Sequence, residues 1–288
     1  MDSLIVELLS LFTAFCYGAS SVLARKGMKD SNPMTGVIIG SLVQVILLAA
    51  LVIADPPDAF NWTAIGLFVA SGILASTLGR LLNFTSIERL GVPLSASIIG
   101  SSPLFSTLFA ALFLGEQIDA ATLLGTVLVV AGIAVARSGG QAVKELRSSA
   151  LVLPIASAIF YGASSVTRKA ALNILPESAF GAVVGAMASL AVFAIYLLMS
   201  QKTDELQVNW GGGKFWVVNG VVVTLAWLAM FSALTVGKVS VVTALGGTNP
   251  LFAVILSALL LKDSEKLNSR IIIGCLAIVA GAAVISLF

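Results

Sequence analysis

Long apolar runs separated by short polar breaks fill the chain from end to end. A helix needs about 20 mostly apolar residues to cross the roughly 30 Å of hydrocarbon in a bilayer. Proline ends such a helix because it lacks the backbone N–H, and Pro33 and Pro56 stand in two of the breaks. The predicted spans are 4–26, 34–54, 62–83, 92–114, 120–137, 149–170, 178–200, 215–235, 239–261 and 269–287. The pattern therefore predicts an all-α integral membrane protein with ten transmembrane helices.

The predicted spans form two similar sets of five. The hexapeptide Tyr-Gly-Ala-Ser-Ser-Val occurs at 17–22 and again at 161–166, and the motif Gly-x-x-Pro-Leu-Phe occurs at 100–105 and 247–252. Because each set has an odd number of spans, the second set enters the membrane from the opposite face. Inverted repeats of this kind are typical of secondary transporters. We expect a first repeat over 1–137, a linker over 138–148 and a second repeat over 149–288, with the two repeats arranged around a central cavity.

Composition agrees with a bilayer as the main solvent. Hydrophobic residues make up 58% of the chain and charged residues 10%, and the mean hydropathy is +1.05. A formal charge of +2 is too small to indicate a nucleic-acid partner, and the chain has no His, the commonest general base and metal ligand. We therefore expect a multi-pass protein of the plasma (cell inner) membrane, with no metal or cofactor. Its expected partners are the lipid bilayer and a small-molecule substrate, and it is either a monomer or a homodimer.

The repeated hexapeptide supplies the first candidate binding residues. An axis in the membrane plane brings equivalent mid-span residues to similar depth, so Tyr17 and Tyr161 are expected to face one shared space. Four serines accompany them, namely Ser20, Ser21, Ser164 and Ser165. These serines either line a substrate site or only allow two helices to pack closely, and the sequence leaves both interpretations open.

Proline interrupts the fourth and ninth predicted spans at Pro103 and Pro250. Backbone groups freed at membrane depth are tolerated where neighbouring groups, water or a cavity satisfies them. We therefore predict a polar cavity at the two breaks, lined by Ser102 and Asn249, with both prolines as hinges. The alternative is a kink that only shapes the helix bundle.

Charged side chains inside the spans are few. Arg80 shares a helical face with Asn83, and an intramembrane charge is by default a functional hypothesis, so both are candidate cavity residues. However, Arg80 also lies within a turn of the predicted end of its span. Arg25 and Arg168 follow the two hexapeptides, and we expect their side chains to extend to opposite membrane surfaces.

Acidic residues and glycines receive structural interpretations. Glu116 and Asp263 end two spans, where we expect solvated helix ends, and no Asp or Glu lies at mid-span to serve a buried proton relay. Glycines recur in the second, fifth, seventh and tenth spans at Gly36, Gly40, Gly125, Gly132, Gly181, Gly185, Gly274 and Gly281. They predict close helix packing, either within the chain or at a dimer face.

The order of these motifs, found twice, resembles the ten-helix EamA-type permeases of the drug/metabolite transporter superfamily. In each half, the hexapeptide and a basic pair precede the Gly-x-x-Pro-Leu-Phe motif, which leads to Leu-Gly-Glu116 or Leu-Lys-Asp263. The chain departs from the family pattern where Tyr17 and Tyr161 replace the usual Trp before Gly, and where Lys262-Asp263 replaces Gly-Glu. The resemblance implies transport of small metabolites by alternating access, with the fifth and tenth spans on a supporting or dimer-forming side. It implies no particular substrate.

The function expected from these features is that of a secondary transporter, either a permease or an exporter. A lipid flippase and a non-transporting membrane scaffold are the alternatives. The lack of His and of mid-span carboxylates argues against a membrane-embedded enzyme. Orientation stays open, because twelve Lys and Arg follow the odd-numbered spans and three lie on the other side. The positive-inside rule then places both termini outside, whereas the resemblance implies cytoplasmic termini.

Overall fold

Helices account for every predicted span. The computed structural model describes residues 2–117, 119–138, 148–200, 206, 209–261 and 269–287. The first repeat contains α1 (Asp2–Gly27), α2 (Pro33–Ala54), α3 (Trp62–Gly72), the π-helical segment η1 (Ile73–Gly79), α4 (Arg80–Leu90), α5 (Val92–Ile99), α6 (Ser102–Leu114) and α7 (Ala120–Ser138). The second contains α9 (Ser148–Ile174), α10 (Ser178–Ser200), α11 (Trp210–Val236), α12 (Val239–Gly246), α13 (Asn249–Leu260) and α14 (Ser269–Leu287).

The predicted class, an all-α membrane protein, is confirmed. Within the described residues, eight helical segments are long and apolar enough to cross a bilayer. Shorter apolar stretches, Ala120–Gly132 in α7 and Ile272–Gly281 in α14, complete the ten spans. Large apolar side chains such as Ile53, Leu198 and Met199 point outward and are about 80% exposed, as expected where the surrounding solvent is lipid.

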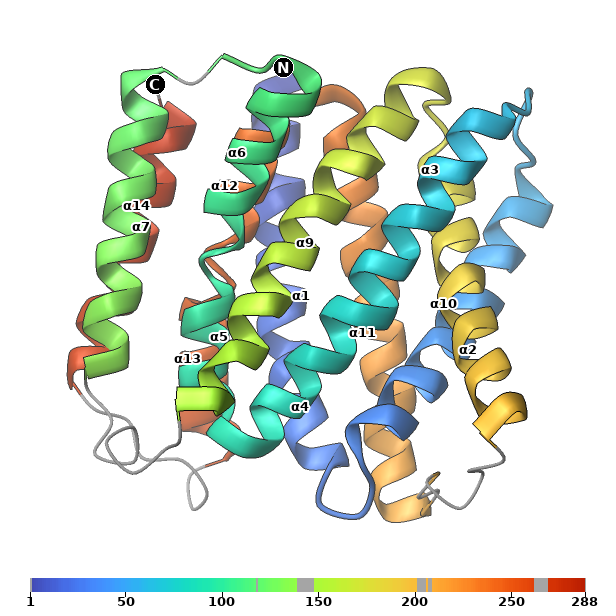
Figure 1. Ribbon diagram of the computed structural model, residues 1–288, viewed down its shortest axis with the longest axis horizontal. Coiled ribbons are helices and arrows are strands. Elements are labelled where there is room, and N and C mark those ends of the chain that lie inside the picture. Colours follow the sequence, from blue (N-terminus) through green and yellow to red (C-terminus); the bar gives the residue numbers. More distant parts are fainter. Residues whose placement is uncertain are drawn as a thin grey trace.

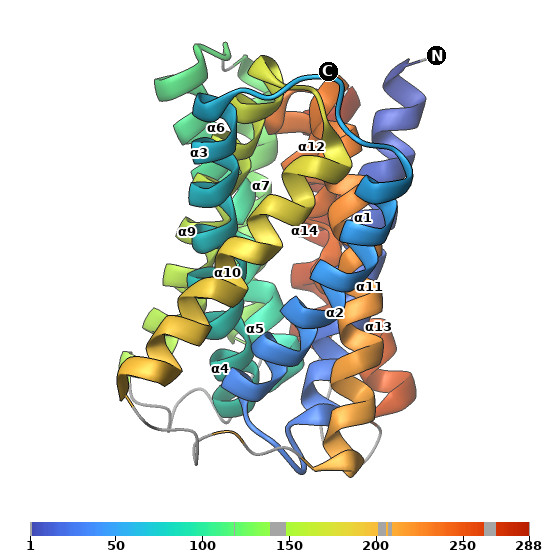
Figure 2. The same cartoon turned by 90° about the vertical axis from the view of Figure 1, so that its right-hand side faces the viewer.

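The two repeats run in opposite directions, as the odd span count predicts. In Figure 1, α1 starts at the upper edge of the molecule, whereas α9 starts at the lower edge. Both marked chain ends lie at the upper edge. At one end of the molecule, α7 and α14 pack against each other (Figure 1). At the other end α2, α3 and α10 lie together (Figure 2).

The interrupted spans meet at the middle of the bundle. The fourth span breaks between α5 and α6 at Gly100 and Ser101, and the ninth breaks between α12 and α13 at the equivalent positions. A β carbon added at Gly100 would lie 2.8 Å from Cγ of Pro250, and one added at Gly247 would overlap Cγ of Pro103. Each proline therefore packs on the glycine of the opposite break.

The third span is longer than predicted. It continues to Leu90 instead of ending at residue 83, and the segment η1 lies in its middle. Asn83 and Ser86 do not mark a membrane surface, because Ser86 is completely buried and Asn83 faces Tyr161. Arg80 consequently lies well inside the span, so the placement of this residue near a helix end was wrong.

Both sets of repeated glycines face neighbours inside the chain. Gly36 lies beneath the indole of Trp216, and Gly185 lies against Gly72 and Trp227. A β carbon at Gly132 would lie 2.6 Å from the carbonyl oxygen of Gly274, so α7 and α14 cross at backbone contact. Of the two alternatives, the structure therefore assigns these glycines to packing within the chain.

Candidate functional site

A cavity lies beside the crossing of the interrupted spans. The empty space inside it is about 880 Å³, open space at its mouth included. All ten residues proposed from the sequence line it: Tyr17, Ser20, Ser21, Arg80, Asn83, Ser102, Tyr161, Ser164, Ser165 and Asn249. They come from both repeats. The remaining polar lining residues are Ser106, Arg168 and Thr243.

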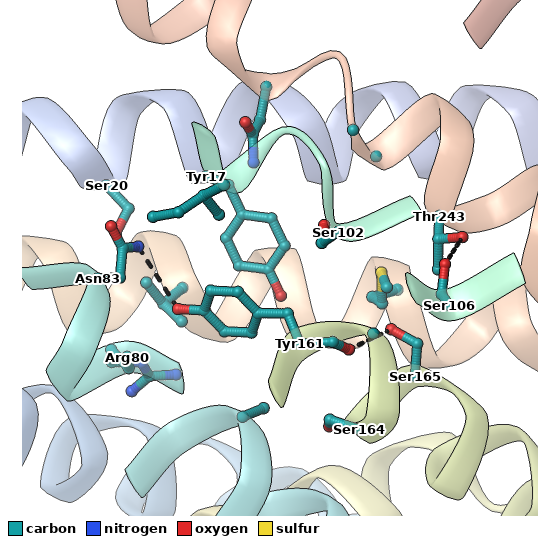
Figure 3. Close-up of a pocket in the computed structure, with 18 of the residues that line it drawn as sticks. Tyr17, Ser20, Arg80, Asn83, Ser102, Ser106, Tyr161, Ser164, Ser165 and Thr243 are labelled. Atoms are coloured by element: carbon teal, nitrogen blue, oxygen red, sulfur yellow. Dashed lines mark hydrogen bonds between the residues drawn. The ribbon is translucent and has the colours of Figure 1, made fainter. Parts of the chain in front are cut away.

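The two tyrosines of the repeated hexapeptide lie side by side in this cavity (Figure 3). Tyr17 comes from α1 and Tyr161 from α9, so equivalent residues of the two inverted repeats meet at one depth. The Nδ2 atom of Asn83 donates to the hydroxyl of Tyr161 at 3.4 Å. Both phenol rings therefore form a shared amphipathic wall.

The hydroxyls of the four serines all make hydrogen bonds within the protein, two of them to neighbouring helices. Ser164 donates to the carbonyl oxygen of Ser71 in α3 at 2.8 Å, and Ser20 accepts from Nδ2 of Asn219 in α11 at 3.0 Å. Ser21 and Ser165 donate to the carbonyl oxygens of the tyrosines four residues earlier, at 3.1 Å and 3.0 Å. The hydroxyl protons of Ser21, Ser164 and Ser165 are thus committed to carbonyl oxygens, whereas Ser20 accepts a hydrogen bond, and all four residues still line the cavity.

Amide groups at the cavity wall have unused hydrogen-bonding capacity. The Oδ1 atoms of Asn83 and Asn249 are buried without a hydrogen-bond partner among the described residues. Such groups are costly in a protein interior unless a ligand or water satisfies them. Asn249 and Ser102 are the first residues of α13 and α6, so the helix interruptions place these polar side chains at the cavity.

Arg80 enters the cavity wall from α4. Its side chain is 5% exposed, and one guanidinium nitrogen donates to Oε1 of Gln44 in α2 at 2.6 Å. Its Cζ atom lies 5.7 Å from the ring centroid of Trp227 in α11. Gln44 is completely buried and holds the guanidinium in place. Neither Gln44 nor Trp227 stood out in the sequence, because nothing local to them shows that they meet Arg80.

Arg168 does not extend to the membrane surface, so the sequence-based interpretation of this residue was wrong. It is 3% exposed and lines the cavity. Its Cζ atom lies 4.9 Å from the ring centroid of Trp227 and 4.3 Å from that of Phe231. The sequence does carry a signal for this position. Arg168 follows Tyr161 by seven residues, so it shares the face of α9 that carries Ser164 and Ser165.

The true repeat equivalent of Arg25 is Lys169, because the hexapeptides pair Tyr17 with Tyr161. Both residues donate to carbonyl oxygens at a helix end. Arg25 reaches the carbonyl of Glu88 in α4 at 3.1 Å, and Lys169 reaches that of Leu234 in α11 at 2.8 Å. Cations are stabilising at helix C-termini. In the two basic pairs that looked alike, Arg25 and Lys169 therefore cap helix ends, whereas Arg168 is a cavity residue.

Glu116 is bound by protein groups, which corrects its interpretation as a solvated helix end. Its carboxylate accepts from the backbone N–H of Val239 at 2.9 Å and from the N–H and hydroxyl of Ser240 at 3.3 Å and 3.0 Å. A carboxylate at a helix N-terminus satisfies otherwise unpaired N–H groups. Glu116 thus joins the end of α6 to the start of α12. Its counterpart Asp263 lies outside the described residues.

Comparison with known proteins identifies the family. The model of the EamA-like transporter family matches residues 4–138 and again 148–287. The chain belongs to this family. An uncharacterized transporter of Archaeoglobus fulgidus is 24% identical over 273 residues, 94% of either chain. The uncharacterized transporter YvbV of Bacillus subtilis is 22% identical and covers 97% of this chain and 90% of its own.

A solved structure described only as the crystal structure of a protein shares the fold. It superposes with a TM-score of 0.76 at 18% identity, over 97% of this chain and 95% of its own. The resemblance found in the sequence is therefore confirmed, and the chain is a multi-pass membrane transporter protein of the EamA-like family. These relatives name no substrate.

Proposed function

We propose that this protein is a secondary transporter that moves a small metabolite across the plasma membrane by alternating access. The observation that carries the proposal is the polar cavity where the two interrupted spans cross, lined by equivalent residues of two inverted repeats. Substrate sites of transporters with inverted repeats lie near mid-membrane at interrupted helices. Tyr17, Tyr161, Asn83 and Asn249 are the proposed contact residues.

The packing of the two breaks supports Pro103 and Pro250 as hinges. Each proline contacts the glycine of the opposite break, so a movement of α6 against α5 is transmitted directly to α12 and α13. Outside the breaks the same spans are regular helices. Rocking of one repeat against the other can therefore concentrate its backbone changes at two adjoining sites.

Transport is tested with the purified protein in liposomes, after a thermal-shift screen against a metabolite library selects the substrate. A ligand that binds only the native state raises apparent stability by mass action. We expect the double variant Tyr17→Ala/Tyr161→Ala to lose transport and to keep a cooperative unfolding transition. Tyr196→Ala is the matched control, because Tyr196 is 44% exposed on α10 and lies outside the cavity lining.

Unchanged transport by the double variant would exclude both tyrosines from the site. Stabilisation by lipids alone would favour a flippase instead of a metabolite transporter.

Alternating access makes a separate prediction for Asn249→Cys in a background with Cys16 and Cys275 replaced by Ala. Both native cysteines are buried, so the new thiol is the reporter. A membrane-impermeant maleimide should label it from either face of sealed vesicles, and substrate should slow both reactions. Labelling from one face under every condition would contradict alternating access.

A further inference from the structure

The cavity contains two buried arginines, and we propose that they form an anion site. Resting on the proposed transport function, this inference assigns the substrate to a chemical class: a small organic anion whose carboxylate or phosphate group binds between Arg80 and Arg168. Both side chains line the cavity and both approach the same indole, that of Trp227. The two guanidinium groups thus border one space from α4 and α9.

Neither guanidinium has a negative partner in the described part of the chain. The hydrogen-bond partner of Arg80 is the amide oxygen of Gln44, and that of Arg168 is the hydroxyl of Ser164 at 3.4 Å. The remaining close groups are the phenol hydroxyl of Tyr17, next to Arg168, and the rings of Trp227 and Phe231. Arginine stays protonated in proteins, and an unpaired charge at membrane depth is strongly unfavourable. The cavity therefore carries two positive charges that an anion would compensate.

Arg168 also has a free donor. Its Nε–H is buried without a partner among the described residues, although the side chain is 97% buried. Guanidinium groups bind carboxylate and phosphate oxygens through paired N–H donors, and Nε–H is one of these donors. The Nε–H of Arg168 is therefore available to donate a hydrogen bond to an oxyanion.

Neutral residues stand at the positions of the other repeat that are equivalent to the two arginines. Counting from the paired tyrosines, the position of Arg168 corresponds to Ala24 in the first repeat. Counting back from the paired Gly100 and Gly247, the position of Arg80 corresponds to Trp227 in the second repeat. Ala24 and Trp227 are both buried, so the other repeat accommodates neutral side chains at these two positions. The two charges are therefore features of single positions and not of the repeated pattern.

The charges of the arginines dominate over those of the helix ends. At each break, the C-terminus of one half-helix adjoins the N-terminus of the next, as at Ile99 and Ser102. Their opposite partial charges of about half an elementary charge offset each other. A net positive cavity thus excludes cations. A zwitterion would lack an acid for its amine, because no Asp or Glu is among the lining residues of the described structure.

The experiment measures binding to the purified full-length protein with matched probes. Succinate and glycerol 3-phosphate are the anions, succinamide and glycerol are their neutral analogues, and putrescine is the cation. We expect the anions alone to raise the unfolding temperature. Arg168→Ala, which introduces the residue of the other repeat, and Arg80→Gln should each weaken anion binding at least about tenfold. Arg168→Lys should keep part of the affinity, and Arg25→Gln should bind as the wild type does.

Three results would contradict the anion site. Equal binding of the neutral or cationic analogues, no stabilisation by either anion at millimolar concentration, or unchanged affinity in Arg168→Ala and Arg80→Gln would overturn the anion site. Unfolding curves of the variants without ligand show whether a variant has lost its fold or only its ability to bind. If Arg168→Ala is unstable, Arg168→Lys takes its place in the test. Anion binding without transport in liposomes would support the site and contradict the transporter proposal. Tighter binding of phosphatidylglycerol than of glycerol 3-phosphate, with both weakened in Arg168→Ala, would support the site and assign its anion to a lipid headgroup.

Discussion

Replacing Gly162 with alanine should separate α9 from α6 and destabilise the protein. A β carbon at this position would lie 2.8 Å from Cβ of Phe105 and 2.8 Å from the backbone nitrogen of Ser106. Carbon atoms in van der Waals contact are about 3.5–4.0 Å apart, so the two helices would have to move apart by roughly 1 Å. Neither neighbour is the end of a flexible side chain. The cost of such overpacking is about 1–3 kcal/mol.

Gly66→Ala is the matched control for this substitution. Gly66 also lies inside a helix, α3, but an added β carbon would meet no atom within 4 Å. Alanine lowers the conformational entropy of the unfolded chain, so this variant should gain about 0.5–1 kcal/mol. The two Gly→Ala changes are therefore predicted to have opposite signs, although they are chemically identical.

Thermal unfolding of the purified protein, followed by intrinsic tryptophan fluorescence, measures both effects. We expect a lower midpoint for Gly162→Ala and a higher midpoint for Gly66→Ala than for the wild type. A wild-type midpoint for Gly162→Ala would refute the close contact of α9 with α6. The same result would also remove the structural reason for glycine after Tyr161 in the repeated hexapeptide.

Three further outcomes are expected from the contacts. Glu116→Gln should destabilise the protein by roughly 1–2 kcal/mol, since a neutral amide caps α12 less well; a wild-type unfolding midpoint would contradict this role. Trp216→Ala should lower the free energy of unfolding by about 3–5 kcal/mol, because the ring is completely buried. Trp62 is 85% exposed, so Trp62→Ala should leave the unfolding midpoint unchanged. The backbone N–H of Thr122 donates to Asp119 at 2.7 Å and holds the pKa of this carboxyl below its usual 3.8. The stabilisation from this hydrogen bond is present above pH 3.8 and is lost as the pH falls through the pKa of Asp119 in the folded state. The wild type should therefore lose stability in acid relative to Asp119→Asn. A stability difference that does not change with pH would argue against this role of Asp119.

Helix number and repeat architecture could be predicted because they depend on local quantities. A run of about 20 apolar residues has one stable state in a bilayer, a helix that satisfies its own backbone. The odd number of spans per repeat then requires inversion. The depth of Tyr17 and Tyr161 follows from that symmetry, and Pro103 and Pro250 interrupt helices wherever they stand. The predicted cavity residues were found together for this reason.

Properties that depend on the direction of a side chain needed the tertiary structure. Arg25 and Arg168 look equivalent as members of two basic pairs, yet a one-residue difference in register turns a helical side chain by about 100°. That rotation takes Arg168 into the cavity and leaves Lys169 at a helix end. The extension of the third span to Leu90 could not be predicted either, because it depends on the neighbours that its polar side chains contact, such as Tyr161 at Asn83.

The amino-acid sequence by itself determined that this protein is a ten-helix membrane protein of two inverted repeats, since bilayer thickness and helix geometry leave no other solution for such apolar runs. Only the tertiary structure decided what the charged and polar side chains do. Gln44 contacts Arg80, Glu116 binds the start of α12, and both cavity arginines approach the ring of Trp227. Each of these contacts joins residues far apart in the chain, and their partners depend on how the helices pack.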